Sequence, residues 1–169
     1  MKSSVLLRNI ISITYYCMIL FWIILLGIFI YSIFGDEESA IQLFKNSEYL
    51  KITSKAALIT TLGYSLISFA FWIYLFRMIR NLMDSLTSKS IFTNFQISSF
   101  KIIGQLLIFL SILDTIFSFI FDFISKNHFR IKFDFLEFWL IIALGLFFIF
   151  ISQIFHKAKA LREENELTV

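Results

Sequence analysis

The sequence predicts an all-α integral membrane protein with four transmembrane helices. Of its 169 residues, 59% are hydrophobic and 16% are charged, and the mean hydropathy is +0.83. Too few polar side chains remain to cover the surface of a soluble domain of this size. The apolar residues gather in four stretches, each long enough to cross a bilayer core of roughly 30 Å. We expect one domain over residues 1–169, with spans at about 10–34, 56–78, 101–123 and 136–155.

The first span, residues 10–34, follows Lys2 and Arg8. It is longer than the ~7–15 apolar residues of a signal-peptide core, and no small-residue cleavage motif follows it. Gly35 and the acidic residues after it end the span. Residues 35–55 form a polar loop with apolar residues embedded in it, which we expect to rest on the membrane surface.

The second span, residues 56–78, is closed by Arg77 and Arg80. Arg80 and Asp84 are spaced i, i+4, which predicts that this helix continues beyond the bilayer. Polar side chains recur on one face of the helix at i, i+4, i+7 and i+11. That face either looks into the bundle or carries hydroxyls bonded to their own helix carbonyls. Its members are Thr61, Ser65, Ser68 and Trp72.

The third helix carries a start signal outside the bilayer. Thr93 followed by Gln96 fits a capping box, in which the Thr side chain binds the N3 amide and the Gln reaches back. Phe92 and Ile97 occupy the N′ and N4 positions of a hydrophobic staple. We therefore expect the helix to begin at Thr93 and to enter the membrane near residue 101. Helices two and three then form a hairpin that projects from the membrane.

The third span carries an acidic residue near its middle, Asp114, within a polar stripe. A carboxylate at the bilayer centre costs ~2.5–3.5 kcal/mol on insertion scales, so it faces the bundle or water. No basic residue lies at mid-depth in another span, and we expect Asp114 to be neutral or to bind hydroxyls of Ser65, Ser68 or Tyr64. It is either a proton or cation site or a structural hydrogen-bond anchor. The stripe consists of Gly104, Ser111, Asp114, Ser118, Asp122 and Ser125.

Residues 128–135 alternate polar and apolar side chains, which indicates a short β segment or an extended strip on the membrane surface. The fourth span, 136–155, continues without Pro or Gly into a charged tail, 156–169.

The single Cys17 lies in an apolar stretch, which excludes a disulfide framework. We find no phosphate loop, zinc-spaced His pair or catalytic triad, so we expect no enzymatic activity, no metal and no cofactor.

Orientation follows from the basic residues. The 15 Lys and Arg residues fall mostly on the side that holds both termini and residues 79–99. By the positive-inside rule, we expect both termini and the hairpin in the cytoplasm of a multi-pass protein of the inner (cytoplasmic) membrane. The positive charges form short clusters between spans, which argues against direct nucleic-acid binding. We expect the lipid bilayer as a partner of such a chain, and the composition also allows a homo-oligomer.

The tail carries acidic residues at a helix C-terminus, where the macrodipole disfavours anions. The i, i+4 pairs Lys159–Glu163 and Arg162–Glu166 offset part of this effect. A basic surface would relieve the remainder, either Arg77 and Arg80 of the same chain or a partner protein. The candidate docking residues are Leu161, Arg162, Glu163, Glu164, Glu166, Leu167, Arg77 and Arg80.

Two short motifs resemble a family of bacterial membrane proteins known as domain of unknown function 2975. One is Ile91-Phe92-Thr93 followed by Phe100-Lys101-Ile102-Ile103-Gly104; the other is Ile154-Phe155, Leu161 and Glu163-Glu164-Asn165-Glu166-Leu167-Thr168-Val169. The resemblance implies four spans and a small cytoplasmic helix-turn-helix regulator as partner. We therefore expect a non-enzymatic regulatory or sensor protein. The alternative is a small transporter or channel subunit built around Asp114.

Overall fold

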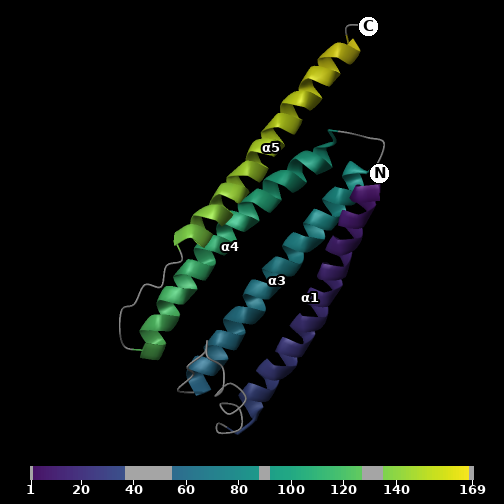
Figure 1. The fold of residues 1–169 in the computed structure, drawn as a ribbon. Helices are drawn as coiled ribbons and strands as arrows, with labels where there is room; N and C mark the ends of the chain where they lie inside the picture. Colours follow the sequence, from purple (N-terminus) through teal and green to yellow (C-terminus); the bar gives the residue numbers. More distant parts are fainter. Residues whose placement is uncertain (1, 37–54, 88–91, 127–134, 168–169) are drawn as a thin grey trace.

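The computed structural model describes residues 2–36, 55–87, 92–126 and 135–167. Within these residues the chain forms the helices α1 (Lys2–Phe34), α3 (Lys55–Leu86), α4 (Asn94–Lys126) and α5 (Phe135–Leu167), as Figure 1 shows. All 4 are long and apolar enough to cross a membrane. The expected all-α architecture with four membrane-spanning helices is therefore confirmed, and the chain is a multi-pass membrane protein.

The helices are longer than the spans that hydrophobicity predicts. α3 has 32 residues and α4 has 33, lengths of about 48–50 Å at 1.5 Å per residue. α3 continues past Arg80 as expected, and α5 includes the tail as far as Leu167. No Pro interrupts any of them. The loop residues 37–54 and residues 128–134 of the expected β segment lie outside the described residues, and Phe135 is already helical.

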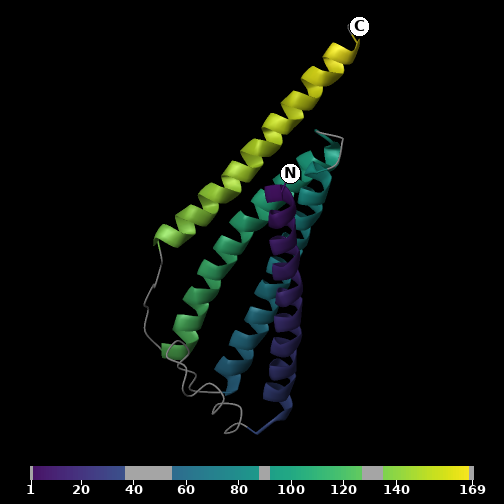
Figure 2. The same ribbon diagram turned by 45° about the vertical axis from the view of Figure 1, so that its right-hand side comes forward.

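The helices follow one another in space as they do along the chain. α1 packs against α3, α3 against α4, and α4 against α5. Figures 1 and 2 show that the N-terminus, the end of α3, the start of α4 and the C-terminus all lie at one end of the bundle. The candidate hairpin and tail residues therefore belong to the same end of the molecule.

The main core lies between α3 and α4, with α5 covering it. Its buried members are Leu75, Leu82, Phe100, Ile103, Leu107 and Leu110. α1 is held to α3 by a smaller cluster around Leu58 and Leu62, and by the Trp22 indole, which donates to the Leu66 carbonyl oxygen at 2.9 Å. Close packing and such inter-helix hydrogen bonds hold helices together in lipid, because lipid tails are as apolar as the side chains.

Two glycines set the closest approach of α4 and α5. A Cβ atom on Gly104 would lie 2.7 Å from Ile149 Cγ1, and one on Gly145 would lie 2.8 Å from the Gly104 carbonyl oxygen. No larger residue fits at either position without displacing a helix. This is the small-residue contact typical of helices that associate within membranes.

Two hydrogen bonds between α4 and α5 show how far α5 is displaced along α4. The Ser152 hydroxyl donates to the Ile97 carbonyl oxygen at 2.8 Å, and Lys159 Nζ donates to Asn94 Oδ1 at 2.7 Å. Asn94 is the first residue of α4, whereas α5 continues beyond Lys159 to Leu167, a further ~12 Å. The end of α5 therefore projects beyond the other three helices (Figures 1 and 2).

Candidate functional site

The turn between α3 and α4 is closed by the expected capping box. The Gln96 amide N–H donates to Thr93 Oγ1 at 3.2 Å, and the Thr93 amide N–H donates to Gln96 Oε1 at 3.2 Å. The Gln96 side chain also donates from Nε2 to the Ser85 carbonyl oxygen and to the Ser85 hydroxyl, both at 3.1 Å. The Ser85 carbonyl belongs to the last turn of α3, where carbonyl groups lack intrahelical partners. Gln96, fully buried, therefore joins both helix ends.

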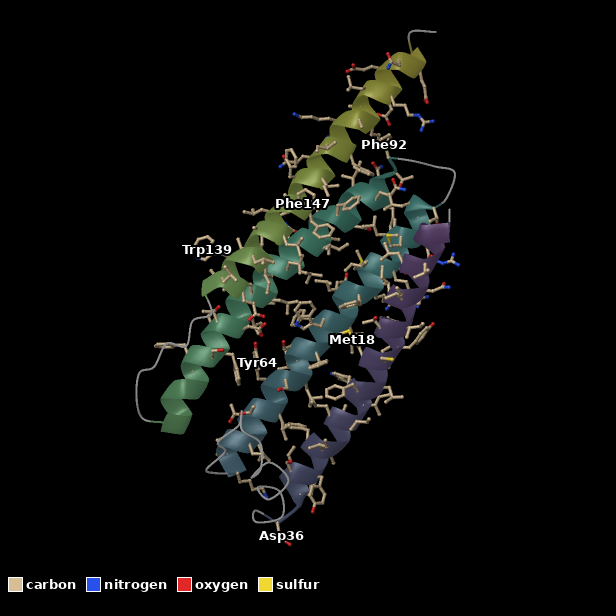
Figure 3. The ribbon with its side chains drawn as sticks, viewed as in Figure 1. Met18, Asp36, Tyr64, Phe92, Trp139 and Phe147 are labelled. Atoms are coloured by element: carbon tan, nitrogen blue, oxygen red, sulfur yellow. The ribbon has the colours of Figure 1, made fainter. Side chains whose placement is uncertain are left out.

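Phe92 occupies a constrained position before this cap. Its φ angle is 63°, in the left-handed region that bulky residues rarely adopt. Its ring centroid lies 5.1 Å from that of Phe155, and Phe155 also packs edge-on against Phe100. Figure 3 shows Phe92 beside α5 at the start of α4. α5 thus contacts the hairpin through Phe155 and Ser152 on its membrane side and through Lys159 beyond.

The tail is a regular, exposed helix, and the two pairs expected along it are present. Lys159 Nζ lies 3.3 Å from Glu163 Oε1, and Arg162 Nε lies 2.8 Å from Glu166 Oε1. Leu161 is 60% exposed, an apolar side chain among charged ones. We call the exposed residues Leu161, Arg162, Glu163, Glu164 and Glu166 the tail surface. Leu167 is the last residue of α5.

Arg80 lies on a different part of the molecule, against α1, and Arg77 is exposed about one turn earlier on α3. Arg80 Nη1 donates to the Tyr16 hydroxyl at 3.3 Å, and Asp84 lies 3.9 Å from Arg8. The described contacts therefore join both Arg80 and Asp84 to α1, which runs antiparallel to α3.

Asp114 receives hydroxyl groups from α3, as expected. The Tyr64 hydroxyl donates to Asp114 Oδ1, and the Ser68 hydroxyl lies 3.4 Å from the same oxygen. The Tyr64 ring stacks on Phe117, with ring centroids 3.4 Å apart, which fixes the direction of the hydroxyl. Figure 3 shows Tyr64 extending from α3 toward α4. Within the described residues no basic side chain forms an ion pair with Asp114.

The other polar residues of the two spans are not all drawn to Asp114. Ser65 donates to the Thr61 carbonyl oxygen at 2.9 Å, and Thr61 donates to Ala57 in the same way. These hydroxyls serve their own helix, whereas Ser68 does not. On α4, Ser111 is buried and Ser118 is exposed, so these two members of the polar stripe have different surroundings.

Several contacts between helices correspond to no recognisable sequence pattern. The Ser152 hydroxyl donates to the Ile97 carbonyl oxygen of α4, and the Asn94 side chain accepts a hydrogen bond from Lys159. Neither Ser152 nor Asn94 belongs to a recognisable sequence pattern. Ser152 interrupts an apolar run, which is the one signal that could have pointed to an inter-helix hydrogen bond. Among the described residues, no three His, Cys, Asp or Glu side chains gather as metal ligands.

The fold and these contacts define a multi-pass α-helical membrane protein with a capped helical hairpin and an extended, charged C-terminal helix at one end. The family model described as protein of unknown function (DUF2975) matches residues 32–169, and the chain belongs to this family. The resemblance seen in the sequence is confirmed. No curated protein and no solved structure matches this chain.

Proposed function

We propose that this protein is a non-enzymatic regulatory membrane protein that binds a cytoplasmic partner through the tail surface. The observation that carries the proposal is the projection of α5 beyond the Lys159–Asn94 contact. A helix end that leaves the bundle presents its side chains to a partner without steric competition from α1, α3 or α4. The exposed Leu161 supplies an apolar anchor, and the surrounding carboxylates supply charge selectivity.

The proposed orientation places this end in the cytoplasm. Arg8, Arg77 and Lys101 lie toward the end of the bundle that holds both termini, and Lys157 and Lys159 lie on the tail itself. The positive-inside rule assigns the end richer in Lys and Arg to the cytoplasm. The localisation we propose is the inner (cytoplasmic) membrane.

The partner that suits the tail surface is a small, basic helix-turn-helix regulator, the class that the family resemblance implies. Three carboxylates of the tail surface, those of Glu163, Glu164 and Glu166, match the basic face with which such a protein contacts DNA phosphates. A regulator held there is kept from DNA, and its release depends on the state of the membrane protein. Contacts of α5 with Asn94, Ile97 and Phe92 connect the tail surface to the hairpin.

The test is a binding measurement between the purified full-length protein and a small, basic helix-turn-helix regulator of the class proposed above. A version that ends at Leu161 and a variant with Glu163, Glu164 and Glu166 changed to Gln are both expected to bind at least tenfold more weakly. Lys157→Gln is the matched control, because Lys157 is exposed on the same helix but lies outside the tail surface. Equal binding by full-length and shortened protein would remove the tail from the mechanism.

The orientation has its own test. Reporter fusions after Val169 and within the hairpin next to Thr93 are expected to report the cytoplasmic side together. A result that places the two positions on opposite sides of the membrane would overturn the proposal as a whole.

A second candidate function is a small transporter or channel subunit that uses Asp114 as a proton or cation site. The observation that favours it is a carboxylate on a membrane-spanning helix that binds two hydroxyls and, within the described residues, no basic group. Asp114→Asn is then expected to abolish a proton- or cation-dependent flux in proteoliposomes at unchanged protein level. If the substitution only lowers the amount of folded protein, Asp114 is a structural anchor.

A further inference from the structure

We propose that Arg8, Arg77 and Arg80 form a binding site for the phosphate headgroup of an anionic phospholipid between α1 and α3. Arg77, Arg80 and Asp84 recur at i, i+3 and i+7 and so share one face of α3. The contacts of Arg80 with Tyr16 and of Asp84 with Arg8 show that this face borders α1. The inference requires only the membrane location of the chain and is independent of the docking role of the tail.

Arg80 is oriented by two aromatic rings. Its guanidinium carbon lies 5.4 Å from the Tyr15 ring centroid and 5.7 Å from that of Tyr16, and one nitrogen donates to the Tyr16 hydroxyl. A guanidinium group carries five N–H donors in a planar fork that matches the oxygens of a phosphate. The rings hold this plane in position, so less conformational entropy is lost when an anion binds.

The charges around Arg80 leave an excess of positive charge. Arg77 is exposed and, within the described residues, forms no ion pair. Asp84 is the acidic residue of this group, and it lies 3.9 Å from Arg8, with both side chains close to half exposed. Arg8, Arg77 and Arg80 together carry three positive charges, and Asp84 carries one negative charge. Basic sites between transmembrane helices at one membrane surface are typical sites for anionic headgroups.

The depth of the group suits a lipid phosphate. Arg8 precedes the apolar stretch of α1, and Arg77 and Arg80 follow the apolar stretch of α3. Tyr15 and Tyr16 stand beside them, as aromatic side chains do at the level of the headgroups. The three arginines thus lie where the phosphate layer of the bilayer meets the protein.

An apolar stripe runs from this site along α1 into the membrane. Ile13, Tyr16 and Leu20 share one face at i, i+3 and i+7 and are 63%, 60% and 62% exposed. An acyl chain can lie along this face while the headgroup is held by the arginines. A free phosphate ion gains nothing from the stripe, which is why we assign the site to a phospholipid.

The test is native mass spectrometry of the full-length protein in a neutral detergent, titrated with phosphatidylglycerol, with phosphatidylcholine and with inorganic phosphate. We expect tight binding of phosphatidylglycerol only. Arg77→Gln and Arg80→Gln are each expected to weaken it about fivefold, the effect of one cationic side chain near an anionic surface. Lys101→Gln is the matched control, because Lys101 is exposed on α4, away from α1, and its loss is expected to leave the affinity unchanged.

Three results would overturn the proposal: equal affinity for phosphatidylcholine, unchanged phosphatidylglycerol affinity in both arginine variants, or equal competition by inorganic phosphate. Arg77→Gln keeps the test valid if Arg80→Gln fails to fold, because Arg77 makes no described contact that the fold would lose. Thermal unfolding of the unmodified protein gives a further measurement. Phosphatidylglycerol is expected to raise the unfolding temperature more than phosphatidylcholine does, and an equal rise would also contradict the site.

Discussion

Gln96 and Ser85 join the facing ends of two membrane helices through a single side chain. Gln96 Nε2 lies 3.1 Å from both the carbonyl oxygen and the hydroxyl of Ser85, while Oε1 of the same side chain accepts the Thr93 N–H. The side chain is fully buried. One residue therefore binds groups at the C-terminus of α3 and at the N-terminus of α4.

Gln96→Leu is expected to lower the free energy of unfolding more than Thr93→Ala does. The first substitution removes the hydrogen bonds that the Gln96 side chain makes to Ser85 and to the Thr93 amide, at about 0.5–1.5 kcal/mol each, whereas losing an N-cap costs ~0.5–2 kcal/mol. Detergent-titration unfolding followed by circular dichroism measures both. Gln105→Leu is the control, because Gln105 is exposed on α4, and it is expected to leave stability unchanged or raised. A smaller effect for Gln96→Leu than for Thr93→Ala would contradict the joint role of Gln96.

At position 92, we expect the glycine variant to be more stable than the alanine variant, the reverse of the usual order within a helix. Both substitutions lose the ring contact with Phe155, but at a φ of 63° alanine keeps the backbone strain and glycine relieves it. Phe92→Gly should therefore be more stable than Phe92→Ala by about 1 kcal/mol. At Phe150, exposed within α5, the order should be the ordinary one, with glycine less stable by about 1 kcal/mol. Alanine proving the better residue at both positions would show that the φ of Phe92 imposes no strain.

Gly104→Ala is expected to force α4 and α5 apart and to lower the free energy of unfolding by about 1–3 kcal/mol, the usual cost of overpacking. The added methyl group would meet Ile149 Cγ1 at 2.7 Å. Gly27→Ala on α1 is the control, because a Cβ atom there has nothing within 4 Å, and alanine favours the helix. Unfolding in detergent measures both, and equal stability changes would argue against the glycine contact.

The hydrogen bond between Tyr64 and Asp114 is tested by a double-mutant cycle. Tyr64→Phe, Asp114→Leu and the double variant are expected to show a coupling free energy of about 0.6 kcal/mol, and at most ~1.7 kcal/mol, the range for hydrogen bonds between helices in membranes. Ser118→Ala, an exposed substitution on the same helix, should change stability by less than about 0.5 kcal/mol. A coupling of zero would mean that the pair contributes nothing to the packing of α3 on α4.

The sequence by itself determined the features that depend on near neighbours along the chain. The four apolar stretches predicted the four helices, the Thr93–Gln96 spacing predicted the cap of α4, and the tail ion pairs followed from i, i+4 spacing. These features can be predicted from the local sequence, because a helix brings residues that are three or four positions apart together whatever surrounds it. The hydroxyl partners of Asp114 were also foreseen, since no other span offered a basic group at that depth.

Only the tertiary structure decided how the helices are placed along one another. It paired Asp84 with Arg8, directed Gln96 to Ser85, exposed Ser118, and displaced α5 so that its end leaves the bundle. Hydrophobic periodicity cannot set this register, because one apolar helix face is equivalent to another in lipid. The register is set by the places where backbones can approach, as at Gly104 and Gly145, and by single polar bonds such as that of Ser152 to Ile97.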